Sequence, residues 1–425
     1  YYIESGKEAL VIDPLRDPEP YIELAKKRNA KLLYILETHF HADFVSGHVE
    51  LAKKTGATIV YGPSAKANFD FKEAKDGEEL PLGKIKIRVL HTPGHTPESS
   101  CYLLIDSSGK AHSVYTGDTI FLGDVGRPDL AVKGNEITEK DLAGWLYDSI
   151  RNKIMTLDDE VIIYPGHGAG SPCGKNIQAG FSCTVGRQKK TNWALQPMTK
   201  EEFITLATKG ITKPPAYFFH DVQLNKNGYE DHEKVLEHSL KPLKFTEVKK
   251  FMDEGAVLLD TRDTDEVKKG YAQKAICISL GGSYAIWAGA LIKPGTKIVL
   301  ITAPGKEKES ISRLARVGYD TVVGYLEGGF DTWVKEGGAV EEYRVITAEE
   351  LKNKLAEKPH ILDIRNKLEW EEGIIEGAQL INMNEMNTRY TELPKDGPVY
   401  VHCKLGGRSF VTYTLLRSLV IDAVD

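Results

Sequence analysis

The sequence of 425 residues has only five cysteines, no excess of basic residues and no long apolar run. The cysteines are odd in number and irregularly spaced, which argues against a disulfide framework and favours a reducing compartment. A net charge of −6 gives no reason to expect nucleic acid or an anionic membrane as a partner. No stretch approaches the roughly 20 apolar residues that span a bilayer. We therefore expect a cytoplasmic protein that does not enter membranes.

The length exceeds what one hydrophobic core normally supports, so we expect two to four domains. Hydrophobic residues make up 41% of the chain and charged residues 27%, as in ordinary globular proteins. No signal peptide is visible, but the sequence starts inside a strand-like segment, and we expect that further residues precede Tyr1.

Residues 38–48 carry three ligand-type side chains within five positions. They follow the apolar run 32–36, which predicts a buried strand. His39, His41 and Asp43 are spaced by two, and in extended backbone this spacing directs all three toward one side. A single histidine is usually structural, whereas three ligand types this close favour a metal site at the end of a strand.

Three further strand-like segments also run into a short turn with a histidine or an aspartate. The turns carry His95, Asp118 and His167, after segments 85–90, 111–115 and 161–164. Because loops beyond sheet edges can converge, four such coincidences indicate one composite metal site. Around these segments the periodicity predicts a hairpin over 1–13, helices over 21–29, 49–56 and 199–209, and strands over 58–61 and 99–105.

Together these residues resemble the ligand pattern of the metallo-β-lactamase superfamily, which implies an αββα sandwich with the metal at one edge of its two sheets. Many members have a second histidine directly after the aspartate, where this chain has Phe44. A phenyl ring cannot bind a metal, so the second metal position is weakened, and His167 loses a partner there.

The mononuclear branch that the chain resembles is the persulfide dioxygenases. The resemblance implies one Fe(II) per chain, bound by His39, His95 and Asp118, with zinc able to substitute. Two imidazoles and one carboxylate on one face of an octahedral ion leave three positions for substrate and dioxygen. We expect His41, Asp43 and His167 to hydrogen-bond the ligands or bound water. Direct coordination by His41 and Asp43, as in zinc hydrolases, is the alternative.

Two residues near this site are candidates for contact with sulfur substrates. Arg127 lies in a segment, 121–129, that matches a loop of the dioxygenase family, and it is a candidate for binding an anionic thiol substrate. An ion pair that stabilises the loop fits Arg127 equally well. Cys173 follows His167 by six residues, so its thiol is either a catalytic sulfur acceptor or a small buried apolar group. Cys101 and Cys277 lie in apolar segments and are expected in the core.

After a connecting tail at residues 190–240, the second half contains an internal repeat. Segments 257–262 and 360–365 share a strand-to-turn pattern, each between a helix and a later buried strand. The repeat resembles tandem rhodanese domains. The expected fold class is therefore a multidomain α/β and α+β chain, in which an αββα sandwich with its tail (1–240) precedes two rhodanese-like doubly wound α/β domains (241–340 and 341–425).

The two copies differ where a rhodanese carries its nucleophile. In the second copy a buried strand ends at Cys403, and a glycine-bearing loop leads into a helix. Backbone N–H groups and the positive helix end stabilise a thiolate or persulfide there, and Arg408 adds a fixed charge. The first copy has Ala303 instead and is expected to be an inactive spacer or docking surface. The second copy stops before the final helix of the first (325–333), so we expect its C-terminal end to be incomplete.

These resemblances imply a persulfide dioxygenase fused to a sulfurtransferase, acting in sulfide detoxification. The first activity would convert a low-molecular-weight thiol persulfide, O2 and water to thiol and sulfite, and Cys403 would pass persulfide sulfur to sulfite, giving thiosulfate. Fusion would raise the effective concentration of sulfite near that thiol. We also expect a homo-oligomer. The alternatives are a zinc thioester hydrolase of the glyoxalase II type with sulfur-carrier domains, and a sulfur carrier with a vestigial metal site. A nuclease is disfavoured by the acidic charge.

Overall fold

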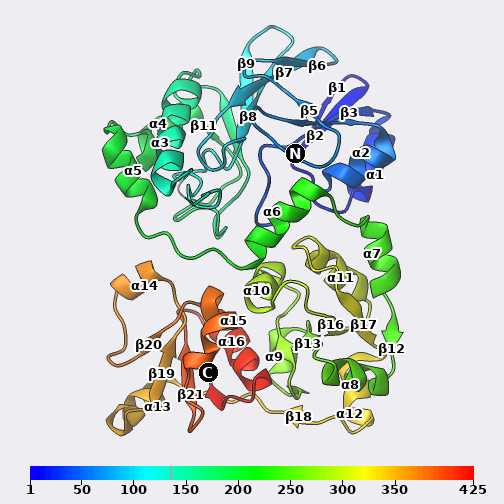
Figure 1. The fold of residues 1–425 in the computed structure, drawn as a ribbon, viewed down its shortest axis with the longest axis vertical. Helices are drawn as coiled ribbons and strands as arrows, with labels where there is room; N and C mark the ends of the chain where they lie inside the picture. Colours follow the sequence, from blue (N-terminus) through cyan, green and yellow to red (C-terminus); the bar gives the residue numbers. More distant parts are fainter. Residues whose placement is uncertain (135) are drawn as a thin grey trace. The chain divides into compact units, whose positions relative to one another are not determined.

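The structure is a computed structural model that describes residues 1–134 and 136–425. The chain divides into two compact units, each of which is described by itself (Figure 1). The first unit comprises Tyr1–Ile211 and Asp221–Tyr229, and the second comprises Thr212–His220 and Glu230–Asp425. The proposed domain boundaries near residues 240 and 340 stay predictions.

Two sheets form the centre of the first unit. The first sheet has the order β1-β2-β3-β4-β5, with β1 (Tyr2–Ser5), β2 (Glu8–Ile12), β3 (Lys31–Leu36), β4 (Thr58–Tyr61) and β5 (Lys72–Glu73). The second sheet has the order β11-β10-β9-β8-β7-β6, with β6 (Glu79–Leu82), β7 (Ile85–His91), β8 (Ser100–Ile105), β9 (Ala111–Gly117), β10 (Ile162–Pro165) and β11 (Cys183–Thr184).

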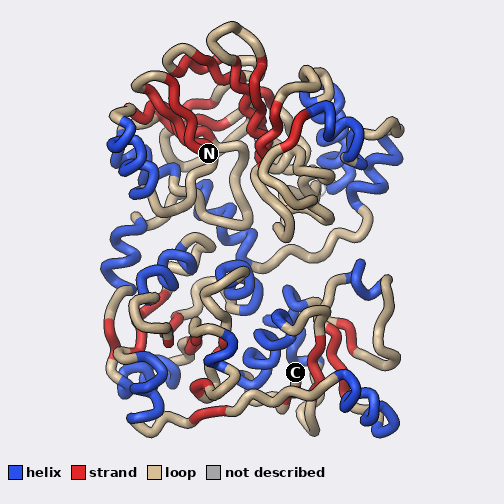
Figure 2. Tube along the Cα trace, turned by 180° about the vertical axis from the view of Figure 1, so that it is seen from behind, coloured by secondary structure: helices blue, strands red, loops and turns tan. Residues whose placement is uncertain are grey.

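Helices cover the outer faces of both sheets, and the strands of the unit gather between them (Figure 2). The helices of this unit are α1 (Glu19–Arg28), α2 (His48–Thr55), α3 (Glu139–Ser149), α4 (Val185–Thr191) and α5 (Lys200–Thr208), with a π-helical turn at Ile150–Ile154 and a 3-10 turn at Trp193–Leu195. A further helix, α6 (Tyr217–Asn227), begins in the second unit and ends in the first.

Three apolar clusters define the layers of this unit. The cluster between the sheets joins Leu10 and Leu36 of the first sheet to Val89 and Tyr102 of the second. Another packs α1 and α2 on the first sheet, and the third packs α3 and α5 on the second. The arrangement is an αββα sandwich, which confirms the predicted fold class for this part of the chain.

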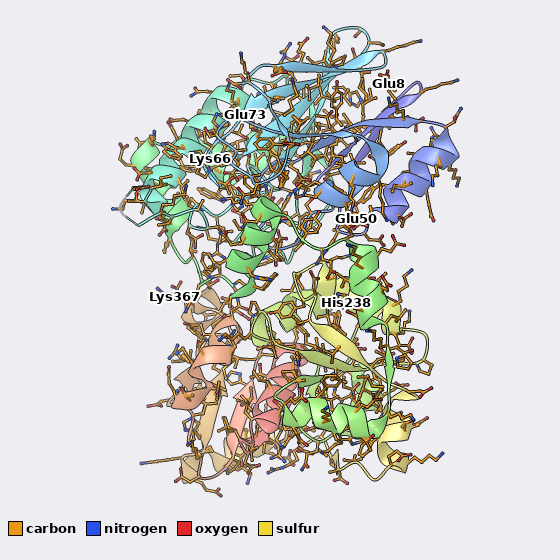
Figure 3. The ribbon with its side chains drawn as sticks, turned by 45° about the vertical axis from the view of Figure 1, so that its right-hand side comes forward. Glu8, Glu50, Lys66, Glu73, His238 and Lys367 are labelled. Carbon is orange, nitrogen blue, oxygen red and sulfur yellow. The ribbon has the colours of Figure 1, made fainter. Side chains whose placement is uncertain are left out.

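Local sequence signals account for where these helices begin and end. The side chain of Thr199 accepts a hydrogen bond from the Glu202 backbone N–H, and the Glu202 side chain accepts one from Thr199 N (2.8 Å), so the predicted capping box starts α5. Helix α2 ends at Gly56, whose φ of 74° favours glycine. Glu50 of α2, labelled in Figure 3, is buried. Lys54 pairs with it at 3.1 Å.

The second unit contains two parallel sheets and a short antiparallel pair. The sheet of the first copy has the order β12-β17-β16-β13-β15, with β12 (Pro242–Leu243), β13 (Val257–Asp260), β15 (Ile276–Cys277), β16 (Ile298–Ile301) and β17 (Val322–Leu326). The sheet of the second copy has the order β20-β19-β21-β22, with β19 (His360–Asp363), β20 (Gln379–Leu380), β21 (Val399–His402) and β22 (Ala423–Val424). Between them, β14 (Tyr271–Ala272) pairs with β18 (Val340–Glu341).

Helices connect these strands, as expected for doubly wound units. They are α7 (His232–Ser239), α8 (Phe245–Asp253), α9 (Thr264–Val267), α10 (Tyr284–Leu291), α11 (Glu307–Ala315), α12 (Gly329–Lys335), α13 (Ala348–Lys354), α14 (Lys367–Glu371), α15 (Met386–Arg389) and α16 (Gly407–Ser418), with 3-10 turns at Leu355–Glu357, Met383–Glu385 and Tyr390–Glu392. Among the described residues, no helix has both the length and the apolar character that a membrane crossing requires.

The connecting tail contains two helices, α6 and α7, in addition to the predicted helix over 199–209. Asp221 and Asn225 of α6 are both buried. Tyr217 and Phe218 at the start of α6 are buried as well, but polar residues at the later buried positions weaken the apolar 3.6-residue period by which sequence reasoning finds helices. The cysteine predictions hold, since Cys101 and Cys277 are fully buried.

Candidate metal centre and candidate sulfur-transfer loop

Four strand ends of the first unit bring the candidate ligands together. His39 follows β3, whereas His95, Asp118 and His167 follow β7, β9 and β10, which run in the same direction. Ligand atoms of His39, His95 and Asp118 lie within 4.8 Å of one another. The Asp118 Oδ2 atom lies 4.0 Å from His39 Nε2 and 3.5 Å from His95 Nε2.

Hydrogen bonds fix which ring nitrogen of each histidine faces this group. The Thr38 hydroxyl donates to Asp13 Oδ2 (2.8 Å), so its oxygen accepts from His39 Nδ1 (3.0 Å). His95 Nδ1 donates to the Arg127 carbonyl at 2.8 Å. Because both Nδ1 atoms carry the proton, both Nε2 atoms present a lone pair, as metal-bound imidazoles do.

The protonation states also fit a cation. Burial lowers the pKa of His39 well below its usual range, so the ring is neutral. Burial alone would raise the pKa of Asp118, but the neighbouring His167 and His39 bring it below its usual range. His39 Nε2 and both Asp118 oxygens are buried without a hydrogen-bond partner. Orphaned buried acceptors are costly, and one cation among them would satisfy all three.

A second group lies beside the first and contains Asp43, His167 and Cys173. His167 Nε2 lies 3.4 Å from both Asp43 Oδ2 and Asp118 Oδ1, so Asp118 is shared between the groups. Cys173 thus adjoins the metal site, as its predicted role requires. Burial raises the pKa of its thiol to about 12, however. A protonated thiol is a poor nucleophile, so this environment favours the alternative of a small buried side chain.

His41 enters a third group, with Asp13 and Glu37. Its Nε2 lies 3.1 Å from Asp13 Oδ1 and 3.5 Å from Glu37 Oε2. His39, His41 and Asp43 thus enter three different groups, although the His39 and His41 ring centroids lie only 4.2 Å apart, and the expectation that all three point to one side stays a prediction. Burial alone would lower the pKa of His41, but Asp13 raises it to about 9. A charged imidazolium must lose its proton before it coordinates a metal, and both ring nitrogens of His41 are buried without a hydrogen-bond partner, so direct coordination stays open beside the supporting role.

Sequence reasoning missed the residues that hold the ligand loop. Asn225 of α6 donates from Nδ2 to the carbonyls of His41 and Phe44, both at 2.8 Å, and its Oδ1 accepts from Ser46 N at 2.9 Å. The Glu98 carboxylate accepts from Phe40 N at 3.1 Å. These residues stand in no motif, so no local signal pointed to them.

Arg127 has the ion pair that was the alternative to substrate binding. Its Nε and one terminal nitrogen contact the Asp129 carboxylate at 2.7 and 2.8 Å, and another nitrogen donates to Pro172 O at 3.2 Å. The guanidinium is buried. These contacts stabilise the loop whose carbonyl orients His95, and contact with an anionic substrate stays a prediction.

In the second unit, Cys403 follows β21 and lies against the start of α16. Its Sγ accepts from Gly406 N at 3.2 Å and from Ser409 N at 3.4 Å. Gly406 has a φ of 86°, which lets the loop turn its amides toward the sulfur. Arg408, nearby, makes a bidentate pair with Glu369 at 2.8 and 2.7 Å. The amides and the helix N-terminus suit a sulfur anion at Cys403.

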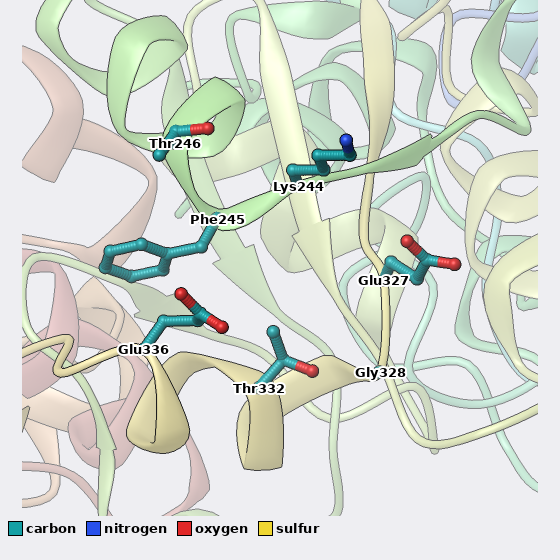
Figure 4. A pocket seen from close by; sticks show the side chains of 7 residues that line it. All are labelled: Lys244, Phe245, Thr246, Glu327, Gly328, Thr332 and Glu336. Carbon is teal, nitrogen blue, oxygen red and sulfur yellow. The ribbon is translucent and has the colours of Figure 1, made fainter.

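The first copy has no thiol at the equivalent position, Ala303. A cavity of about 390 Å³ opens at the carboxyl ends of β12 and β17 in this copy (Figure 4). None of the seven residues that line it carries a thiol: Lys244, Phe245, Thr246, Glu327, Gly328, Thr332 and Glu336. The chemistry of this cavity is therefore not that of a sulfur carrier.

Comparisons with known proteins agree with this division of the chain. Residues 1–167 match the metallo-beta-lactamase superfamily, and residues 244–336 and 347–423 match the rhodanese-like domain. The mitochondrial persulfide dioxygenase ETHE1 of Bos taurus is 31% identical over 212 residues, which are 49% of this chain and 75% of that protein. The solved structure of a metallo-beta-lactamase from Staphylococcus aureus is similar with a TM-score of 0.67 and 29% identity, covering 76% of this chain and 93% of that one.

Hydrolases are similar to the same extent. The cytoplasmic hydroxyacylglutathione hydrolase of Arabidopsis thaliana is 33% identical over 45% of this chain and 71% of that protein. The probable hydroxyacylglutathione hydrolase glo2 of Schizosaccharomyces pombe is 32% identical over 39% of this chain, and the match spans only 60% of the hydrolase. The comparisons therefore leave the activity open. They agree on the family, and the chain belongs to the metallo-beta-lactamase superfamily, with two rhodanese-like domains after its metallo-beta-lactamase domain.

Proposed function

We propose that the first unit is a persulfide dioxygenase with one Fe(II) per chain, and that Cys403 is the nucleophile of a sulfurtransferase. The observation that carries the first part is the set of hydrogen bonds around the metal site. They direct two imidazole lone pairs and one carboxylate, of His39, His95 and Asp118, toward one point, while His41 is kept charged by Asp13. Two histidines and one carboxylate are the donor set of non-haem iron oxygenases.

Bound there, Fe(II) would supply adjacent coordination positions for a persulfide sulfur and dioxygen. The chain's own residues hold the donors in place. Thr38 and the Arg127 carbonyl fix the two imidazoles through their Nδ1 atoms. Phe44 packs on His41, with ring centroids 4.3 Å apart, and Phe121 packs near His167 at 5.9 Å. The proposed products are a thiol and sulfite.

At Cys403 the thiolate would accept the outer sulfur of a thiol persulfide and hold it as an enzyme persulfide. The amides of Gly406 and Ser409 already point at Sγ and would stabilise its charge. Sulfite from the first unit would then take this sulfur and leave as thiosulfate. The two activities together would clear persulfides derived from sulfide.

The test is anaerobic loading of the full chain with Fe(II), followed by oxygen uptake with glutathione persulfide as the probe. We expect about one iron per chain, oxygen consumption and sulfite. All three are lost in His95→Gln and kept in His112→Gln, a matched control at an exposed histidine of β9. Cys403→Ser should keep oxygen uptake and lose thiosulfate formation. No oxygen uptake by the iron-loaded protein would refute the dioxygenase.

The alternative is a zinc thioester hydrolase of the glyoxalase II type. It is supported by the similar hydrolases and by the group of Asp43, His167 and Cys173, whose donors could contribute to a second metal position. Two zinc ions per chain as purified, together with hydrolysis of a glutathione thioester, would favour this function. Near-stoichiometric iron would exclude it, and would also exclude a vestigial metal site.

A further inference from the structure

We propose that Lys268, in the rhodanese copy without a catalytic cysteine, binds the anionic sulfur acceptor at Cys403. The first copy would then be part of the active site of the second, rather than a spacer. The ligand class is a small sulfur oxyanion with two negative charges, such as sulfite. The inference rests on the proposed sulfurtransferase function of Cys403.

The first copy packs directly on the helix that carries the Cys403 loop. Residues 409–416 of α16 are buried. Cys277 N, in β15 of the first copy, donates to Thr414 Oγ1 of α16 at 3.0 Å. Trp287 of α10 lies so close that a Cβ on Gly407, in the loop itself, would be 3.2 Å from its ring. The loop geometry therefore depends on both copies.

Two cavities flank the loop, and Lys268 lines both of them. The cavity that contains Cys403 has a volume of about 450 Å³ and is also lined by His402, Tyr343 and Gly406. The other has a volume of about 510 Å³ and shares Lys268, Tyr343 and Gly406 with it. Lys268 is the residue of the first copy that lines the cavity of Cys403. The other lining residues from the first copy belong to the second cavity.

The other basic side chains near Cys403 contact carboxylates or are neutral. Arg408 is paired with Glu369 and also interacts with Cys403, and Lys404 lies 3.5 Å from Glu372. Burial lowers the pKa of His402, which keeps that ring neutral. Asp425 also lines the cavity, and the Tyr343 hydroxyl donates to its carboxylate.

Lys268 is exposed, and the nearest carboxylate shown to interact with its charge is that of Asp425. Its Nζ lies 5.5 Å from the Tyr343 ring and 5.9 Å from the Phe410 ring. These aromatic faces hold the ammonium at the cavity without neutralising it. A dianion that enters this cavity thus meets the positive charge of Lys268, which also acts on the Asp425 carboxylate in the same cavity.

The transfer step needs a cation beside the sulfur. The sulfite lone pair attacks the outer sulfur of the Cys403 persulfide, a new S–S bond forms, and the bond to Sγ breaks. The electron pair of that bond stays on Sγ, so Cys403 returns to a thiolate and thiosulfate leaves. A dianion must approach an anion here, and a positive charge in the same cavity lowers that repulsion.

The test compares two acceptors under anaerobic conditions, with the full chain and with Cys403 loaded by a thiol persulfide. In Lys268→Gln we expect the KM for sulfite to rise about tenfold while kcat changes less than about twofold, as expected for one lost charge contact. The KM for 2-mercaptoethanol, a neutral acceptor at pH 7, should not change. Lys268→Arg should restore the KM for sulfite. Lys269→Gln, at the adjacent exposed lysine, should behave as the unaltered protein.

Three results separate the possible failures. If Cys403→Ser still transfers sulfur, the sulfurtransferase function itself is wrong. If Cys403→Ser is inactive and Lys268→Gln leaves the KM for sulfite unchanged, only the role of Lys268 is wrong. If Lys268→Gln impairs both acceptors equally, or Lys269→Gln acts alike, the lysine has a structural effect and the proposal is overturned.

Discussion

The clearest prediction concerns Asn225, the residue of α6 that holds the ligand loop. Its side chain is 1% exposed and makes three hydrogen bonds, two to loop carbonyls and one from Ser46 N. A net contribution of about 1 kcal/mol for each bond gives about 3 kcal/mol for Asn225→Ala. The substitution also leaves a buried N–H without a partner, so this value is a lower bound for opening the loop.

Hydrogen exchange of the intact protein, read by mass spectrometry on peptides from residues 38–48, measures that opening. A loss of about 3 kcal/mol corresponds to exchange on the order of 100-fold faster at Ser46. Because the loop carries His39, we also expect iron affinity to fall about 10-fold to 100-fold. Asn227→Ala is the matched control, since Asn227 lies on the same helix and its side chain meets the exposed Asn68. Unchanged exchange at Ser46, or equal loosening in the control, would refute the reasoning.

Three further substitutions test other parts of the structure. Glu369→Gln removes the charge that pairs with Arg408, and we expect sulfur transfer to slow several-fold in single-turnover assays. Thr414→Val leaves the buried Cys277 N–H unpaired and should lower the free energy of unfolding of the second unit by about 1–3 kcal/mol, measured with denaturant. Thr412→Val is the control, because the buried Thr412 hydroxyl has no hydrogen-bond partner, and this substitution should change the free energy of unfolding little. Burial lowers the pKa of His48 to about 3, below its unfolded value, so stability falls as pH drops from about 6.5 toward 3. His48→Gln should remove up to one proton from that dependence, measured as unfolding free energy against pH.

The strands that end at the site could be predicted from the sequence because their buried faces are apolar. The expected strand over residues 85–90 is β7, Ile85–His91, and the expected buried segment 398–402 is β21, Val399–His402. Repeated patterns also revealed the two rhodanese-like copies. These signals arise from periodic burial, which a single sequence records directly.

The supporting contacts could not be predicted in this way. Asn225 lies 184 residues from His41 in the chain, and its helix buries polar groups, so neither spacing nor periodicity marks it. The place of Lys268 in the Cys403 cavity could not be predicted from the sequence either, because it follows from the packing of one copy on the other. Cytoplasmic location and a homo-oligomer stay predictions.

His39 and His41 differ in protonation state, and this difference shows that a motif alone does not determine the protonation of its histidines. Both rings are buried, they lie two residues apart, and their centroids are 4.2 Å apart. His39 meets a hydroxyl, which is neutral, and remains a neutral imidazole with a free lone pair. His41 Nε2 lies 3.1 Å from Asp13 Oδ1, and the Asp13 carboxylate stabilises the charged form of the ring. The difference between the two rings thus comes from Asp13, a residue 26 positions before His39 and outside the motif. With a neutral residue at position 13, the same motif would offer His41 as a further donor, as in the zinc hydrolases.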